Sequence, residues 1–197
     1  MDRYSKLPIV AAFAAATLAL GACAEDAAEE QAEQTGEAEP SGDTLAEALS
    51  GAEGLGTVSE ALRDVGLTQV FDGAGSYTIL APSDEAFAAL GETGEALTEP
   101  DQRAAMAAIL RDHIVPGYLT PDDIRNAIEL SGDDSVQMRT TGGHVLTFTA
   151  DGDAITVTAE DGATARLSGE ALRARNGVAI PLDGVLKATN QTQTGTQ

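Results

Sequence analysis

The spacing of apolar residues changes partway along the chain, from a helical period to a strand period. In the first half, Val58, Leu62 and Val65 recur every three or four residues, which places their side chains on one face of a helix. Such stripes and their flanking capping residues predict helices over residues 45–49, 57–65, 84–90 and 100–112, and another that begins after Thr120. Three apolar residues that follow the second helix are expected to lie in the core: Leu67, Val70 and Phe71.

From Ser135 onwards the period is two, which is typical of half-buried strands. The alternating apolar residues form four pairs: Val136 and Met138, Leu146 and Phe148, Ile155 and Val157, and Ala165 and Leu167. Turn-forming residues separate the pairs at 141–143, 151–153 and 161–162. We therefore expect four strands joined by hairpins into an antiparallel meander.

Residues 77–90 are the stretch in which a strand passes into a helix. Residues 77–80 form a β-type run that is too short for a helix, and Pro82 is expected to end the strand because it has no N–H to donate. Ser83 suits the N-cap of the helix, and Asp84 follows at the positive end of the helix dipole. The stretch predicts a strand and a helix that share one core.

Residues 78–90 resemble the first signature segment of fasciclin domains, in which a strand ends in Ala-Pro-Thr/Ser-Asp and a helix follows. The residues that carry this match are Ala81, Pro82, Ser83, Asp84 and Phe87. A segment over 55–67 also matches the family. The order of the matching segments, from Thr57 to Lys187, strengthens the resemblance beyond any one motif.

Two later segments resemble the same family. Residues 113–120 share His113, Pro116 and Gly117 with it, although Asp112 stands where the family usually has tyrosine. The last signature segment is matched by three residues, Asn176, Gly177 and Asp183, whereas the usual histidine is replaced by Ile180. These positions are expected to serve structure or interaction.

The resemblance implies an α+β fold: a single fasciclin-like domain with N-terminal helices packed on a β-sheet wedge and a C-terminal antiparallel meander. We expect this domain over residues 44–188. Residues 1–22 are interpreted as a lipoprotein signal peptide, residues 23–43 as a lipidated cysteine with an acidic disordered tether, and residues 189–197 as a flexible tail.

The N-terminus has the features of a bacterial lipoprotein leader. Arg3 and Lys6 precede an apolar stretch of 14 residues, which is too short for a membrane span of about 20 residues. Cys23, the only cysteine, follows Leu-Gly-Ala, which resembles the lipobox where a cysteine is lipidated. The resemblance implies a triacylated Cys23, carrying chains such as palmitate, in the bacterial cell envelope and, since Ala24 follows, at the outer membrane. An ordinary secretory leader with a chance cysteine is the alternative.

The charge of the chain restricts its partners. Its 11 basic and 32 acidic residues give a net charge of −21, so neither nucleic acid nor an anionic lipid surface is expected to bind it. The acidity fits a well-solvated surface, and adaptation to high salt is the alternative.

Candidate chemistry is sparse. Of the two histidines, His113 is expected to be packed and hydrogen-bonded, and His144 to be exposed or half buried in a hairpin. The acids of residues 151–153 lack the later positions of a calcium loop, and Ser83 lacks the glycines of a nucleophile elbow. We expect no catalytic residues, no metal and no cofactor, and therefore no enzyme.

The resemblance implies a membrane-anchored, extracytoplasmic adhesion or interaction module that contacts a cell-surface or matrix protein or glycan. A binding protein for an apolar small molecule, such as a pigment, is the alternative, although four phenylalanines and no tryptophan offer little aromatic surface. Because both Asp112 and Ile180 depart from the family pattern, integrin-type binding is not expected to carry over.

Overall fold

The first signature strand is a central strand of a mixed four-stranded sheet, called sheet A here. A computed structural model of the protein describes residues 40–187. The strand order in sheet A is β2-β1-β8-β7. Its members are β1 (Tyr77–Pro82), β2 (Ile114–Pro116), β7 (Leu172–Ala174) and β8 (Gly177–Leu182). β1 and β8 are parallel, with Tyr77 opposite Gly177 and Pro82 opposite Leu182, and the other pairs are antiparallel.

The predicted meander forms the second sheet, sheet B, with strand order β3-β4-β5-β6 and antiparallel pairing throughout. Its strands are β3 (Ser135–Arg139), β4 (Val145–Asp151), β5 (Ala154–Ala159) and β6 (Thr164–Arg166). The register places Val136 opposite Phe148, and Phe148 opposite Val157, so the alternating apolar residues share one face. The four strands expected from the period of two are confirmed.

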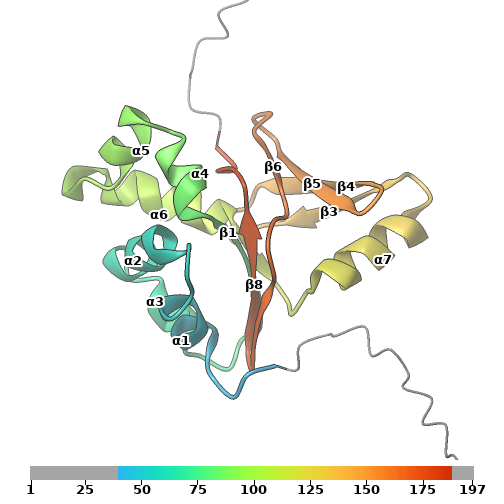
Figure 1. The fold of residues 1–197 in the computed structure, drawn as a ribbon, viewed down its shortest axis with the longest axis horizontal. Helices are drawn as coiled ribbons and strands as arrows, with labels where there is room; N and C mark the ends of the chain where they lie inside the picture. Colours follow the sequence, from blue (N-terminus) through green and yellow to red (C-terminus); the bar gives the residue numbers. More distant parts are fainter. Residues whose placement is uncertain (1–39, 188–197) are drawn as a thin grey trace, which may run out of the picture. The chain divides into compact units, whose positions relative to one another are not determined.

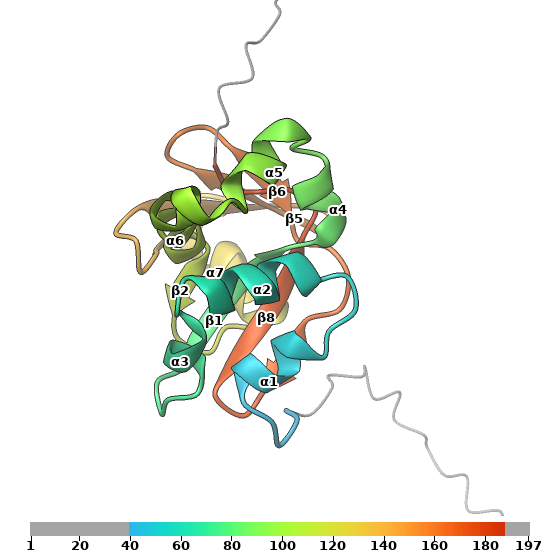
Figure 2. The ribbon, with the colours of Figure 1, turned by 90° about the vertical axis from the view of Figure 1, so that its left-hand side faces the viewer.

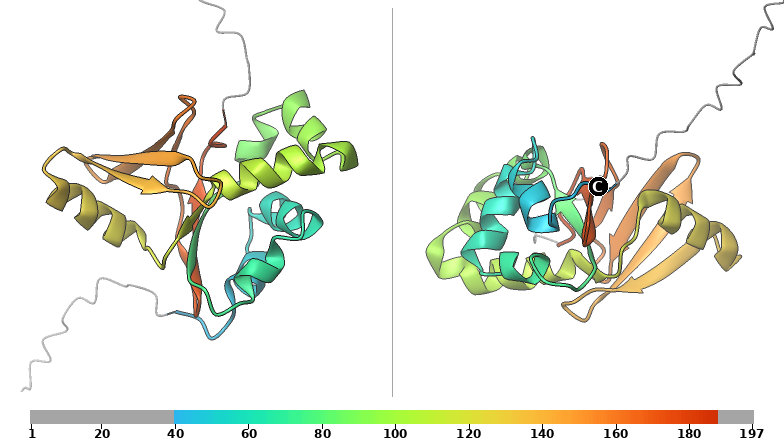
Figure 3. Two further views of the ribbon diagram at one scale, coloured as in Figure 1. Left: turned by 180° about the vertical axis from the view of Figure 1, so that it is seen from behind. Right: turned by 90° about the horizontal axis from the view of Figure 1, so that it is seen from below.

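The helices lie on both sides of β1 and β8 (Figure 1). The N-terminal side carries α1 (Leu45–Ser50), α2 (Gly56–Asp64), α3 (Thr68–Phe71), α4 (Asp84–Ala88), α5 (Glu92–Leu97), the 3₁₀ helix η1 (Pro100–Gln102) and α6 (Arg103–Asp112). These helices form one layer in front of the strands in Figure 2. The remaining helix, α7 (Pro121–Ser131), lies beside sheet B, as the view from behind in Figure 3 shows.

Two hydrophobic cores meet at sheet A. Ile79 and Ala81 of β1 face the helical core, whereas Leu80 between them faces the core under sheet B and α7. The neighbouring strand does the same, since Ala179 faces the helices and Ile180 the meander. Because both faces are covered, these strands have continuous apolar sequences rather than alternating ones. The expected α+β class, with helices on a sheet and a following meander, is confirmed.

Of two further sequence predictions, one is confirmed and one is wrong. Pro82 is the last residue of β1, so the strand ends at the residue that the sequence predicts. The N–H of Leu80 donates to the His113 carbonyl oxygen, on the side of β1 that faces β2. The nitrogen of Pro82 faces the same side, but β2 has already ended there. The missing N–H of Pro82 therefore breaks no ladder bond. Val70 is 37% exposed rather than in the core, because the four-residue helix α3 turns Phe71 inward instead.

Other elements had no sequence prediction, among them α3, α5 and the three-residue strand β7. In the described range 40–187, no helix is both long enough and apolar enough to span a bilayer.

Gly177 begins β8 at a point where no side chain fits. A Cβ there would overlap the carbonyl oxygen of Tyr77 and lie 2.7 Å from Cδ2 of Leu45. The absent side chain thus lets α1 and β1 approach the start of β8 together.

We predict that Gly177→Ala lowers the free energy of unfolding by about 1–3 kcal/mol, the usual cost of overpacking a core. Urea denaturation of the purified protein measures this change. Gly51→Ala is the matched control, because its Cβ would meet only the Glu47 carbonyl oxygen at 3.9 Å. Equal stability of the two variants would contradict the packing argument.

Candidate functional site

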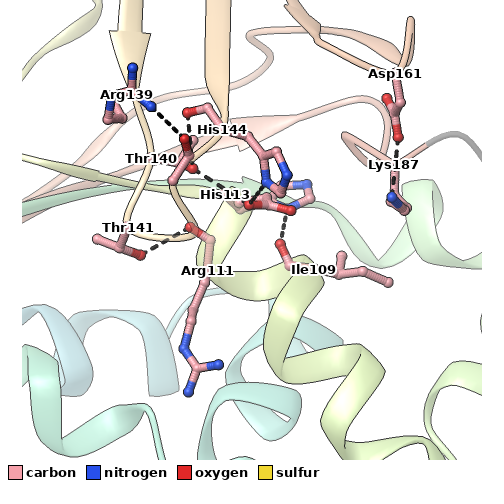
Figure 4. Close-up of polar contacts among 11 residues, drawn as sticks. Ile109, Arg111, His113, Arg139, Thr140, Thr141, His144, Asp161 and Lys187 are labelled. Carbon is pink, nitrogen blue, oxygen red and sulfur yellow. Dashed lines mark hydrogen bonds and ion pairs between the residues drawn. The ribbon is translucent and has the colours of Figure 1, made fainter.

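His113 lies between α6 and β2, at the boundary of the two cores, and its side chain is fully buried. Its Nδ1 is 2.8 Å from the Ile109 carbonyl oxygen, and its Nε2 accepts the backbone N–H of Leu186 at 2.9 Å (Figure 4). A carbonyl only accepts and an amide N–H only donates, so the ring is neutral with its proton on Nδ1. Burial lowers the pKa of His113 below 6.5, and the Ile109 hydrogen bond and the Asp112 charge oppose this shift.

The neighbouring residue, Asp112, pairs with the other histidine. Its Oδ1 lies 2.7 Å from Nδ1 of His144, whose side chain is 60% exposed. This hydrogen bond, together with the negative charge of Asp112, raises the pKa of His144 above 6.5. Asp112, which stands where the family has tyrosine, therefore holds the tip of the β3–β4 hairpin against the end of α6.

Backbone contacts hold the same hairpin tip. Thr141 donates its hydroxyl to the Arg111 carbonyl oxygen at 3.0 Å. Its backbone N–H donates to the Ile114 carbonyl oxygen at 2.8 Å. A Cβ on Gly142 would overlap the Asp112 carboxylate, so a side chain there would displace this carboxylate from its place beside His144. An open cleft of about 280 Å³ lies beside the hairpin, and the pair Lys187–Asp161, 3.4 Å apart, lines it along with His144.

Asp84 of the first signature joins two helices. Its carboxylate accepts the N–H of Thr57 at 2.7 Å and that of Gly56 at 3.3 Å, and so caps α2, whose own N-cap Leu55 has no side-chain acceptor. These bonds, of which the one from Thr57 is the strongest cause, lower the pKa of Asp84. Ser83 caps α4 as predicted, with its Oγ 3.1 Å from the Ala86 nitrogen.

The other residues of this segment fill the core. Ala81, Pro82 and Phe87 are all buried, the first and last of them in the helical core.

Asn176 of the last signature connects three parts of the chain. Its Oδ1 accepts the N–H of Leu45 at the start of α1 at 2.8 Å, and its Nδ2 donates to the carbonyl oxygens of Phe71 and Gly73 at 2.6 and 3.0 Å. Asp183, at the other end of β8, accepts the N–H of Arg166 at 2.6 Å and so joins sheet A to sheet B.

The segment after His113 forms a turn. Gly117 has φ +111°, a value that favours glycine, and its carbonyl oxygen accepts the buried hydroxyl of Thr78 at 2.9 Å. The same hydroxyl accepts the N–H of Leu119 at 2.9 Å. Pro116, by contrast, is an exposed residue at the end of β2. Thr78 was not singled out from the sequence, where it reads only as a β-branched strand residue.

The signature residues do not converge on one reactive centre. They lie at separate junctions between elements, and their polar atoms mostly bind backbone groups. Within residues 40–187, no group of three or more His, Cys, Asp or Glu side chains is arranged to hold a metal ion. Residues 151–153 form the β4–β5 turn, where Arg125 donates to two carbonyl oxygens. Cys23 lies outside the described residues.

A helical layer and an antiparallel meander, on opposite faces of a mixed sheet and joined by these hydrogen bonds, define a two-core α+β domain of the fasciclin type. The chain belongs to the fasciclin domain family, whose model matches residues 53–188. Its fold is similar to that of a FAS1 domain pair from the insect cell adhesion molecule fasciclin I, with a TM-score of 0.65 and 14% identity. That match covers 74% of this chain and 51% of the insect chain.

A curated relative, Protein sll1483 of the bacterium Synechocystis sp., is 29% identical over 106 residues, which are 53% of this chain and 54% of the relative. The chain thus spans about half the length of each of these two proteins.

We predict opposite titration of the two histidines. In nitrogen-detected NMR spectra, His113 keeps the neutral Nδ1–H form well below pH 6.5, whereas His144 gains its proton above pH 6.5. His144→Gln assigns the signals, because the chain has only two histidines. A His113 ring that titrates at or above 6.5 would contradict the buried hydrogen-bonded geometry.

The pH dependence of the free energy of unfolding should follow from the directions of the same two pKa shifts. The unfolded chain binds a proton at His113 that the folded chain does not, so the contribution of His113 is present above about pH 6.5 and is lost as the pH falls. The contribution of His144 is full below its unfolded pKa and is lost as the pH rises through its raised folded pKa.

We also predict that Asp84→Ala lowers the free energy of unfolding by about 1 kcal/mol, because α2 loses its cap. Urea denaturation measures the change. Asp64→Ala is the control, since Asp64 lies at the last turn of α2, where a negative charge is unfavourable. If the control were destabilised as much as Asp84→Ala, the capping role would be wrong.

Proposed function

We propose that this protein is a membrane-anchored, extracytoplasmic interaction module that works in adhesion, without catalysis, by contact with a cell-surface or matrix protein or glycan. One observation carries the proposal: the polar atoms of the family signature are engaged within the fold. Asp84, His113 and Asn176 use their side chains to hold backbone groups of distant segments. What the domain offers to a partner is then its surface.

The environment of His113 supports a non-catalytic role. A general base needs a free nitrogen within reach of a substrate proton, and both ring nitrogens of His113 are bound to backbone groups in a fully buried position. His144 is exposed but pairs with Asp112, which raises its pKa and so favours the protonated ring over the neutral base. Fasciclin domains are in general not catalytic, and the insect relative is described as a cell adhesion molecule.

The N-terminal sequence supports the anchored location. Cys23 at the end of the leader supplies the site for lipidation, and several acyl chains would hold the protein where one would bind only marginally. Of the acidic stretch that follows, residues 24–39 precede the part bound to the domain and can span up to about 55 Å when extended. An anchored domain on such a tether reaches partners beyond the membrane surface.

A binding protein for an apolar small molecule, such as a pigment, is supported less well. The open clefts of the described domain are lined by charged residues, such as Glu60 and Arg103 in one and Asp112 and Lys187 in another. Phe71 and Phe148, which could stack on a pigment, are instead fully buried in the two cores. Visible absorption or a bound mass in native mass spectrometry would favour this alternative.

The proposal predicts that deletion of the gene reduces surface attachment or cell aggregation of the producing bacterium. Complementation with the intact gene should restore attachment, whereas Cys23→Ser should not, because the secreted domain would no longer be held at the cell. Immunoblots of membrane and soluble fractions confirm expression and release of the variant. Attachment that is unchanged by deletion would remove the support for adhesion.

A further inference from the structure

An open cleft of about 460 Å³ lies outside the carboxyl ends of the parallel strands β1 and β8. Four segments line it: the α1–α2 connection, the start of α4, the β6–β7 connection and the last residues of β8. Ser83 and Asp183, from the first and last signature segments, both lie at this cleft. The pairing of β1 with β8 brings these segments together.

The cleft has an apolar floor and an acidic rim. Leu55, Ala86, Leu172 and Pro181 are among the floor residues, all of them buried or half-buried. Glu53, Glu85, Glu170 and Asp183 are exposed charges on the lining, which includes no Lys, Arg or His.

The rim carboxylates differ from two of the acids in the cleft beside His144. Within the part of the chain that the structure describes, the side chains of Glu53, Glu85 and Glu170 have no hydrogen bond or ion pair. In the cleft beside His144, by contrast, Asp112 is hydrogen-bonded to His144, and Asp161 is paired with Lys187. The uncompensated charge around the larger cleft favours a positively charged occupant.

The spacing of these carboxylates indicates the kind of cation. No three acidic side chains of the described residues converge as metal ligands do, so the rim does not form a divalent cation site. Separate negative charges around an apolar floor fit a longer cation. A lysine side chain has this form, because its methylene groups can cover apolar surface while its ammonium group stays at the polar edge.

We propose that this cleft docks a lysine-rich segment of a partner protein. The lysine stems lie on Leu55, Leu172 and Pro181, and the ammonium groups face Glu53, Glu85 and Glu170. This inference rests on the proposed interaction function and gives its partner a chemical class, a basic protein segment.

The test measures binding of a fluorescein-labelled peptide of alternating lysine and alanine to the full chain in a non-ionic detergent, by fluorescence anisotropy. The cleft variant is Glu53→Gln, Glu85→Gln and Glu170→Gln together. The matched control is Glu60→Gln, Glu95→Gln and Glu99→Gln, which changes the net charge equally on α2, α5 and the residue before η1. Thermal unfolding confirms that both variants fold.

We expect the cleft variant to raise the Kd about tenfold, which is about 1.4 kcal/mol, and the control to change it less than about twofold. A peptide of alternating glutamine and alanine should not bind. Absence of binding by the unaltered protein, or equal weakening by both variants, would overturn the docking site. In the second case the attraction would come from the general acidity of the chain.

The attachment assay separates this inference from the proposed function. A strain that produces the cleft variant should attach less well than one that produces the control. If the cleft variant restores attachment fully, adhesion stands and the docking site is wrong.

Discussion

The parallel pairing of β1 with β8 is the constraint on which the rest of the domain depends. Each strand sends successive side chains into opposite cores, so one pair of strands forms a wall of both. The pairing also unites the first and last signature segments. Gly177 must lack a side chain because β1 and α1 meet β8 at its first residue.

The family signature is best understood as a set of connections between segments far apart in the sequence. Asp84 caps a helix that precedes it, His113 holds the backbone beyond β8, and Asn176 holds the start of α1. In each case a buried or half-buried side chain satisfies backbone groups that would otherwise lack partners. Such residues preserve the fold, while the surface remains able to change with the partner.

Local sequence patterns predicted much of the fold and little of how its parts meet. The meander follows from the period of two, and Ser83 was identified as an N-cap from its own neighbours. The parallel pairing and the capping of α2 by Asp84 depend on contacts between remote residues, which periodicity does not record. No sequence pattern linked Asp112 with His144, which the structure pairs. The prediction that Val70 lies in the core was wrong because α3 is a single turn.

The entry of the chain into the domain has a mechanical consequence. The N–H of Ser41 donates to the Arg173 carbonyl oxygen, and the N–H of Arg175 donates to the Asp43 carbonyl oxygen. The side chain of Asn176 accepts the N–H of Leu45. The first described residues are therefore bound to the β7–β8 hairpin. A pull on the N-terminal side therefore enters sheet A before it reaches the helices. The three hydrogen bonds lie one after another along residues 41–45, so they must break in turn before the pull reaches α1. The β7–β8 hairpin thus shields α1 from tension at that end until these bonds are lost.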